Sequence, residues 1–250
     1  MADGVQAGDT GHLGEVTHWG AIDGVSIDFP MVVPEMSSAT LTFMVPIGPA
    51  QALIPGDGFE VADMGDGQAM LVLALVDYVR NPWGDYNEVN FGMLVHPTGR
   101  PEAVGAFQWR MPVNQQMTCT AGNQVLGLPK TVDDVEFEYS GDGPGDARVT
   151  VRLTMGGEPT LTVSFPRVPP MGDPSPERTL TYSYLDGVPT AVPLTIDLPT
   201  GLMDPADVRI ELGTSAAADE LRSLGLPKAP DLAMWGEGLS GTFEWPTPIV

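Results

Sequence analysis

Glycine and proline divide this chain into short apolar runs, and this pattern limits the folds that it can adopt. The 250 residues include 30 glycines and 25 prolines, well above average usage, and they are spread along the chain rather than gathered into one tract. Such spacing is typical of many short strands joined by turns. We expect strands over residues 39–45, 69–78, 88–95, 104–111, 135–139, 148–155, 160–165, 179–185, 192–198, 209–212 and 241–245.

Two of these segments indicate how the sheet is buried. Val149, Val151 and Leu153 alternate with polar residues over 148–153, which is the period-two pattern of a strand with one buried face. Residues 70–76 are apolar at every position, which favours a central strand covered on both sides.

Helical signals are sparse in this sequence. Residues 215–224 are the best case, because Ser215 can act as an N-cap and Gly225 as a stop. A second short helix is expected over residues 48–53. Since eleven strands rarely remain one open sheet, the sequence predicts a single α+β domain over residues 1–250. This domain is predominantly antiparallel β, with a curved or barrel-like sheet and few short helices.

The charge balance excludes several kinds of partner. With 33 acidic and 11 basic side chains the formal net charge is −22, so the protein repels nucleic acids and anionic membranes. The longest apolar run, residues 69–76, is less than half of what a bilayer crossing needs. The first residues lack the features of a secretory signal, and the single cysteine, Cys119, cannot form an internal disulfide. We expect a cytoplasmic protein that binds neither nucleic acid nor membrane.

Motifs for metals and common cofactors are missing from the sequence. The histidines and the cysteine lack metal-ligand spacing, and no P-loop, dinucleotide fingerprint or Gly-x-Ser-x-Gly elbow occurs. The histidines are His12, His18 and His96. We therefore expect neither a metal site nor a cofactor.

Lysine is nearly absent, although it is normally among the commonest residues. The chain has nine arginines but two lysines, Lys130 and Lys228, and both end the pentapeptide Leu-Gly-Leu-Pro-Lys. Where a residue type is so rare, each remaining copy deserves a specific explanation. For Lys228 we expect a place just past the helix over 215–224, where a cation complements the helix dipole.

Lys130 suits a different role, because a neutral lysine amine can add to a ketone. The resulting protonated Schiff base accepts the electrons released when a neighbouring carbon–carbon bond breaks. An ordinary lysine, with a pKa of about 10.4, is protonated at neutral pH, so a reactive one needs burial or a nearby cation. Residues 125–129 are apolar and include a proline, which favours a desolvated site for Lys130. The structural alternative is a lysine that extends from a turn into solvent.

The segment 122–130, with the sequence GNQVLGLPK, resembles the catalytic-lysine segment of the acetoacetate decarboxylase family. Residues 86–88, Tyr-Asn-Glu, are similar to that family's Tyr-x-Glu motif, whose glutamate faces the lysine in the pocket. Weaker matches are residues 53–55, 106–111 and 235–245. The resemblance implies a Schiff-base lysine at Lys130, a pocket glutamate at Glu88 and assembly into a homo-oligomer.

Departures from the family pattern narrow this expectation. The family's second lysine, which lowers the pKa of the first, corresponds to Thr131 here. By spacing, its second pocket glutamate falls near Leu71 or Leu73, and its pocket arginine near Met36. Such losses resemble the wider superfamily, which includes Schiff-base aldolase-dehydratases acting on pyruvate and other oxo acids.

Four residues join Lys130 as candidates for the site. Glu88 can serve as general acid or base, although an exposed carboxylate at a strand end is the alternative. Gln108 and Arg110 alternate along one expected strand, where they can bind a substrate carbonyl and carboxylate, or simply form an exposed face. Tyr86 can donate a hydrogen bond to a carbinolamine, although aromatic residues on sheets more often belong to the core.

We therefore expect a Schiff-base-forming carbon–carbon lyase that acts on a small keto acid, decarboxylase-type, through Lys130 and Glu88. The first alternative is a pyruvate or oxo-acid aldolase-dehydratase that uses the same lysine. The second is a non-catalytic protein that binds a small molecule. No cofactor is needed in the first two cases, because the iminium formed on the lysine is itself the electron sink.

Overall fold

The computed structural model describes residues 15–141, 146–172, 175–197 and 200–249. The helices are α1 (Ile47–Gln51), α2 (Gln116–Leu126) and α3 (Ala216–Ser223), with a 3-10 turn at Pro205–Asp207. The strands are β1 (Thr17–Ile22), β2 (Val25–Phe29), β3 (Met31–Pro46), β4 (Phe59–Val61), β5 (Gln68–Arg80), β6 (Tyr86–Pro97), β7 (Gly105–Val113), β8 (Lys130–Val132), β9 (Asp134–Ser140), β10 (Arg148–Met155), β11 (Glu158–Pro166), β12 (Pro176–Leu185), β13 (Val188–Asp197), β14 (Thr200–Leu202), β15 (Arg209–Leu212), β16 (Leu232–Phe243) and β17 (Thr247–Pro248).

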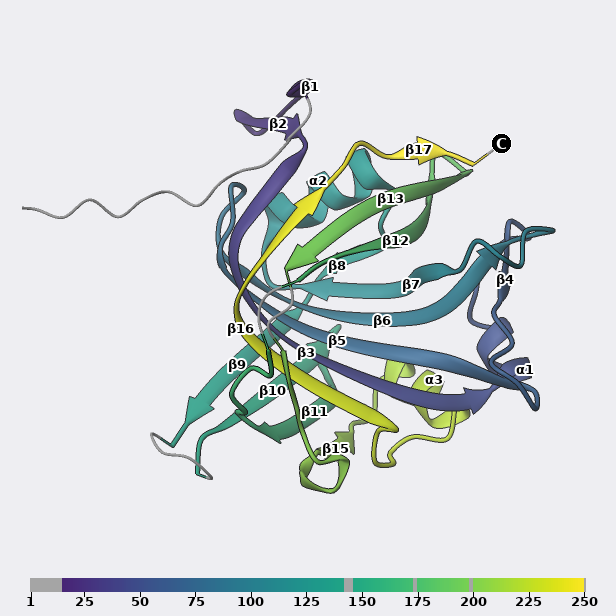
Figure 1. Ribbon diagram of the computed structural model, residues 1–250, viewed down its shortest axis with the longest axis vertical. Coiled ribbons are helices and arrows are strands. Elements are labelled where there is room, and N and C mark those ends of the chain that lie inside the picture. The colour runs from purple at the N-terminus through teal and green to yellow at the C-terminus, as the bar shows by residue number, and fades with distance from the viewer. Residues whose placement is uncertain (1–14, 142–145, 173–174, 198–199, 250) are drawn as a thin grey trace, which may run out of the picture.

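Seven strands close into a mixed barrel. They follow the order β16-β3-β5-β6-β7-β12-β13, and a further pairing of β13 with β16 closes the ring. The pairs are antiparallel except for β7 with β12, while β8 adds to β7 as a second parallel partner. Helix α2 lies across the upper end of the barrel in Figure 1. The sequence-based prediction of a mainly antiparallel, barrel-like α+β fold is confirmed.

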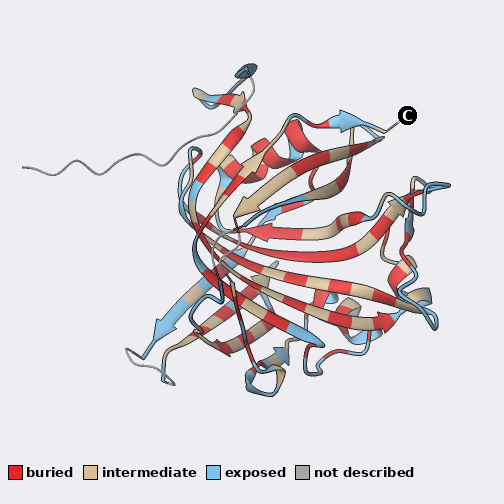
Figure 2. Ribbon diagram, in the orientation of Figure 1, coloured by how far each residue is buried: buried red, intermediate tan, exposed pale blue. Residues whose placement is uncertain are grey.

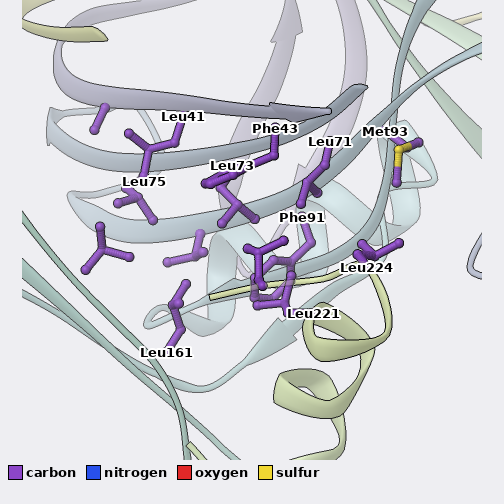
Figure 3. Close-up of a cluster of buried hydrophobic side chains, with 14 of the residues drawn as sticks. Leu41, Phe43, Leu71, Leu73, Leu75, Phe91, Met93, Leu161, Leu221 and Leu224 are labelled. Carbon is purple, nitrogen blue, oxygen red and sulfur yellow. The ribbon is translucent and has the colours of Figure 1, made fainter. Parts of the chain in front are cut away.

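A second sheet covers one face of the barrel strands. It has the order β15-β11-β10-β9, and together with α3 it buries the largest hydrophobic core. Figure 3 shows Leu71 and Leu73 of β5, Leu161 of β11 and Leu221 of α3 in this core. Because side chains alternate along a strand, every second residue of β3, β5 and β6 points the other way, into the barrel.

All eleven predicted strands overlap strands of the structure, and the two predicted helices correspond to α1 and α3. Residue 198, at the end of one predicted strand, lies outside the described residues. The expectation for residues 70–76 is half right. Strand β5 is central, with Leu71, Leu73 and Leu75 fully buried, but the alternate residues Val72 and Ala74 are partly exposed.

Helix α2 was not predicted from the sequence. It begins after Gln115, whose side chain accepts a hydrogen bond from the Thr118 amide, and it ends at Gly127 in the left-handed conformation, with φ at 65°. A side chain at Gly127 would also collide with the Tyr184 backbone carbonyl. The glycine therefore turns the chain sharply from α2 into β8, where Lys130 lies.

No described helix is both long and apolar enough to cross a membrane.

Candidate active site

The backbone of Lys130 is held by the last turns of α2. Asn123 contacts it twice: its side-chain oxygen accepts a hydrogen bond from the Lys130 amide at 2.8 Å, and its amide nitrogen donates to the Lys130 carbonyl at 3.0 Å. The Cys119 thiol donates to the same carbonyl at 3.3 Å. These contacts fix the starting point of the lysine side chain.

Gly122 makes room for the lysine side chain beside the helix. A Cβ atom at this position would lie 2.6 Å from Lys130 Cδ and 2.9 Å from Cε, which is closer than such atoms approach. The glycine therefore lets the lysine run along α2 into the barrel. This explains in physical terms why the segment that resembles the family motif starts with a glycine.

The amine of Lys130 forms a buried ion pair with Glu88 of β6. Lys130 Nζ lies 2.7 Å from Glu88 Oε2, and the two side chains are 5% and 2% exposed. The same amine donates to Thr118 Oγ1 at 3.2 Å and to Tyr86 Oη at 3.3 Å. Lys130 and Glu88 are 42 positions apart in sequence, and the fold of the barrel brings them together where α2 covers its end.

The other oxygen of Glu88 is held by neutral donors. Asn90 donates to Glu88 Oε1 at 3.0 Å and Tyr78 at 3.4 Å. Tyr78 stacks on Tyr86 with ring centroids 4.2 Å apart. Burial raises the pKa of both tyrosine hydroxyls well above the ordinary value, and the charge of Glu88 raises it further, so both remain protonated donors at neutral pH.

Gln108 and Arg110 do not share a face, contrary to the sequence-based expectation. Gln108 pairs with Gly92 and Arg110 with Phe91, so one extra residue, Trp109, forms a β-bulge between them. The bulge reverses the alternation. Gln108 therefore faces the barrel interior over Gly92, whereas Arg110 faces outward.

The outward-facing Arg110 is engaged by α3. Its guanidinium makes two hydrogen bonds of 2.6 Å to Glu220, and Trp109 donates to the same carboxylate at 3.1 Å. Burial alone would raise the pKa of Glu220, but these hydrogen bonds prevail and lower it. Arg110 is thus a structural link between β7 and α3.

Two further expectations are corrected by the structure. Leu71 and Leu73 of β5 face the large core. The residue between them, Val72, points to the opposite face of the sheet, which is the face that carries Glu88 on β6. Lys228 lies past α3, but its amine donates to the Met44 carbonyl of β3 rather than to the helix end. The basic residue in the last turn of α3 is Arg222.

Met36 and Thr131 complete the comparison with the family pattern. Met36 is buried in a hydrophobic cluster separate from the large core, together with Val33 and Leu239, and it lies beside Gly241 of β16. Thr131, which follows the buried lysine, is exposed and donates to Asp133 at 2.6 Å. The side chain after the lysine therefore points away from the ion pair.

Sequence reasoning missed three residues of the site. Asn90 has a readable signal, because it is two residues after Glu88 and thus on the same face of the strand. Thr118 and Tyr78 carry no such signal, since their contact depends on where α2 and β5 pack. Among the described residues no three side chains of the metal-binding types form a cluster.

Comparison with known proteins places these observations in context. The acetoacetate decarboxylase (ADC) family profile matches residues 24–245 of this chain. None of the curated proteins matches it.

Solved structures share the fold at low sequence identity. An acetoacetate decarboxylase aligns with a TM-score of 0.62 at 13% identity, covering 88% of this chain and 89% of that one. An acetoacetate decarboxylase-like enzyme from Sphingomonas wittichii RW1 has a TM-score of 0.58 at 16% identity, with coverage of 94% and 99%. The enduracididine biosynthesis enzyme MppR, complexed with pyruvate, has a TM-score of 0.58 at 14% identity, with coverage of 84% and 86%.

Proposed function

Because this chain belongs to the acetoacetate decarboxylase family, we propose that it is a Schiff-base-forming lyase that acts on a small keto acid through Lys130. The observation that carries the proposal is the buried pair of Lys130 with Glu88. Perturbed or paired ionisable groups that are buried in a protein interior tend to mark functional sites, because burial of charge is costly without a purpose.

Glu88 is placed to manage the protons of the reaction. Its carboxylate accepts the ammonium proton of Lys130 as the keto acid enters, and the neutral amine then adds to the ketone carbon. The carbinolamine hydroxyl takes a proton from Glu88 and leaves as water, which forms the iminium. Cleavage of the bond to the carboxyl carbon releases carbon dioxide, and its electron pair moves to the iminium nitrogen. The resulting enamine carbon takes up a proton, and water releases the ketone from Lys130.

Two neighbours support these steps. Tyr86 and Thr118 both contact the amine, so they orient it and can hydrogen-bond the carbinolamine oxygen. Gln108 faces the same interior over Gly92, and we assign to it a hydrogen bond with the substrate. Arg110 is left out of this proposal, because its guanidinium is bound by Glu220 on the far face.

An aldolase-dehydratase is the second candidate function. The departures from the decarboxylase pattern at Thr131, at Leu71 or Leu73 and at Met36 favour it, because they resemble the wider superfamily that includes aldolase-dehydratases. Here the same iminium would lose a proton from the carbon beside it, form an enamine and attack an aldehyde. One solved relative, MppR, is complexed with pyruvate, the type of keto acid that such chemistry uses.

Reductive trapping tests the proposal. The protein is mixed with acetoacetate, pyruvate or a longer 3-oxo acid, reduced with sodium borohydride, and examined by intact mass and peptide mapping. An adduct on Lys130 supports the Schiff base, and its mass shows whether carbon dioxide has left. The matched control is Lys228, which ends the same pentapeptide but is exposed. Lys130→Met should abolish trapping and Lys228→Met should leave it unchanged.

The outcomes separate the candidates. An adduct that retains the carboxyl group and consumes an added aldehyde supports the aldolase-dehydratase. No adduct with any keto acid refutes both enzymatic functions and leaves the third candidate, a non-catalytic binding protein.

We also propose that the protein is a cytoplasmic homo-oligomer that works without a cofactor. Light scattering of the purified protein tests the oligomeric state, and a single-chain mass would refute it.

A further inference from the structure

The face of the barrel that carries Glu88 continues as a row of uncharged side chains. Along β6, Asn90 and then Gly92 follow Glu88 on this face. Strand pairing places further side chains of β5, β3 and β16 beside them. We define the apolar row as Met44, Met70, Val72, Ala74, Leu94 and Met234.

The side chains of the apolar row are more exposed to solvent than their neighbours along the same strands. All six of its members are partly exposed, whereas Leu71, Leu73 and Leu75, which alternate with them on β5, are fully buried. Figure 2 shows the resulting alternation of tan and red along β3 and β5. Partly exposed apolar side chains on the inside of a barrel gain stability when a ligand covers them.

Unpaired polar atoms lie between the ion pair and the apolar row. Asn90 is 9% exposed and donates to Glu88, but its oxygen has no partner. The oxygen of Gln108, which lies over Gly92, is also buried without a partner. A buried acceptor without a donor is costly, so these two oxygens point to a ligand that supplies one. The hydroxyl of a carbinolamine formed on Lys130 is such a donor.

Charge limits what the apolar row can bind. The charged or ionisable side chains on this face include residues at the strand ends, where Arg80 of β5 pairs with Glu35 of β3 and His96 of β6 lies beside Glu60 of β4. The nearest cation on β7, Arg110, faces the other way. None of the six residues of the apolar row is charged, and both Arg80 and His96 already lie beside a carboxylate, so a second carboxylate or a phosphate on the substrate gains little on this face.

We propose that the keto acid carries an uncharged apolar tail, alkyl or aryl, with its ketone at Lys130 and its tail along the apolar row. This inference rests on the proposed function. Leu94, the member of the row on β6, lies six residues from Glu88, which is about 20 Å of extended strand. Asn90 and Gly92 lie between them on the same face, and Ala74 and Val72 of the row pair with these two residues, so the face is longer than acetoacetate or pyruvate requires.

The test compares straight-chain 3-oxo acids from four to ten carbons in the trapping reaction on Lys130. Each added methylene that the row covers should raise the apparent affinity about fourfold. A dicarboxylic acid of matched length should show no such gain. Met70→Gln keeps the size of the side chain but adds an amide, so it should lower the ratio of ten-carbon to four-carbon affinity. The matched control is Val188→Gln, at an exposed position at the start of β13, which should leave this ratio unchanged.

Thermal unfolding of each variant shows that the ratio of ten-carbon to four-carbon affinity is measured on folded protein. If Met70→Gln fails to fold, Ala74→Ser is a smaller change in the same apolar row. Equal affinity for all chain lengths, with acetoacetate trapped on Lys130, overturns the inference and leaves the proposed function intact. Absence of any adduct overturns the proposed function first, and this inference with it.

Discussion

Replacing Lys130 with methionine tests whether, in the buried ion pair, the attraction between the two charges offsets the cost of their desolvation. At 2.7 Å the attraction between the two charges is about 6 kcal/mol for an effective dielectric constant of about 20. Desolvation of two charges costs a similar amount, so the intact pair adds little net stability. Lys130→Met removes the attraction but leaves Glu88 buried, with hydrogen bonds from Asn90 and Tyr78 to its other oxygen. We expect a loss of about 3–5 kcal/mol in the free energy of unfolding.

Urea unfolding followed by tryptophan fluorescence measures this loss, and an unchanged m-value shows that the same surface is exposed. The control is Arg152→Met, because Arg152 and Glu138 are also 2.7 Å apart but are 48% and 57% exposed. Breaking that pair should cost about 0.2–1 kcal/mol. Adding Glu88→Gln to Lys130→Met should recover most of the loss, since no charge is then buried. The reasoning is refuted if Lys130→Met costs no more than Arg152→Met, or if the double variant is as unstable as the single one.

Three further predictions follow from the contacts around the site. Gly122→Ala should slow borohydride trapping, because its Cβ displaces the side chain of Lys130, whereas Gly48→Ala has open space and should not; equal slowing by both contradicts this. Burial raises the pKa of the Cys119 thiol, so iodoacetamide should label it slowly in the folded protein at pH 8 and rapidly in urea; rapid labelling without urea contradicts its burial. Glu220→Gln should cost about 1–2 kcal/mol at pH 7. Because the pKa of Glu220 is lowered on folding, this contribution is present above an unfolded value of about 4.3 and is lost as the pH falls through the lower folded value, so urea unfolding at pH 7 and pH 3 should show the difference shrinking.

Most of the strands were predictable because their signals are local. Turn residues and period-two alternation are visible within a window of a few residues, as over 148–155, where the prediction and β10 have the same bounds. Helix α2 was missed because residues 116–126 mix threonine, cysteine and glycine, which are poor helix formers. Its stability comes from packing across the end of the barrel, and packing of that kind is not a local property of the sequence.

The site was predictable in part for the same reason. Glu88 lies beside Lys130, as the resemblance implies, whereas the contact of Tyr86 with the same amine was not part of that expectation. The orientation of Arg110 was not predictable, because a single extra residue at Trp109 reverses every side chain after it, and a bulge is decided by the pairing with the neighbouring strand.

The double contact of Asn123 with the backbone of Lys130 determines when that backbone loses its conformational freedom. Because both the amide and the carbonyl of Lys130 are already bonded in the folded chain, its backbone entropy is lost during folding, about 1–2 kcal/mol, and not when a ligand arrives. The side chain of Lys130 is held as well, by Glu88, Thr118 and Tyr86. Lys228 ends the same pentapeptide at the protein surface, where its amine donates to the Met44 carbonyl, so the identical five residues place one amine in a buried ion pair and the other on an exposed strand end. The different surroundings of the two lysines are therefore set by the elements packed beside them, such as α2 beside Lys130, and not by their neighbours in the chain.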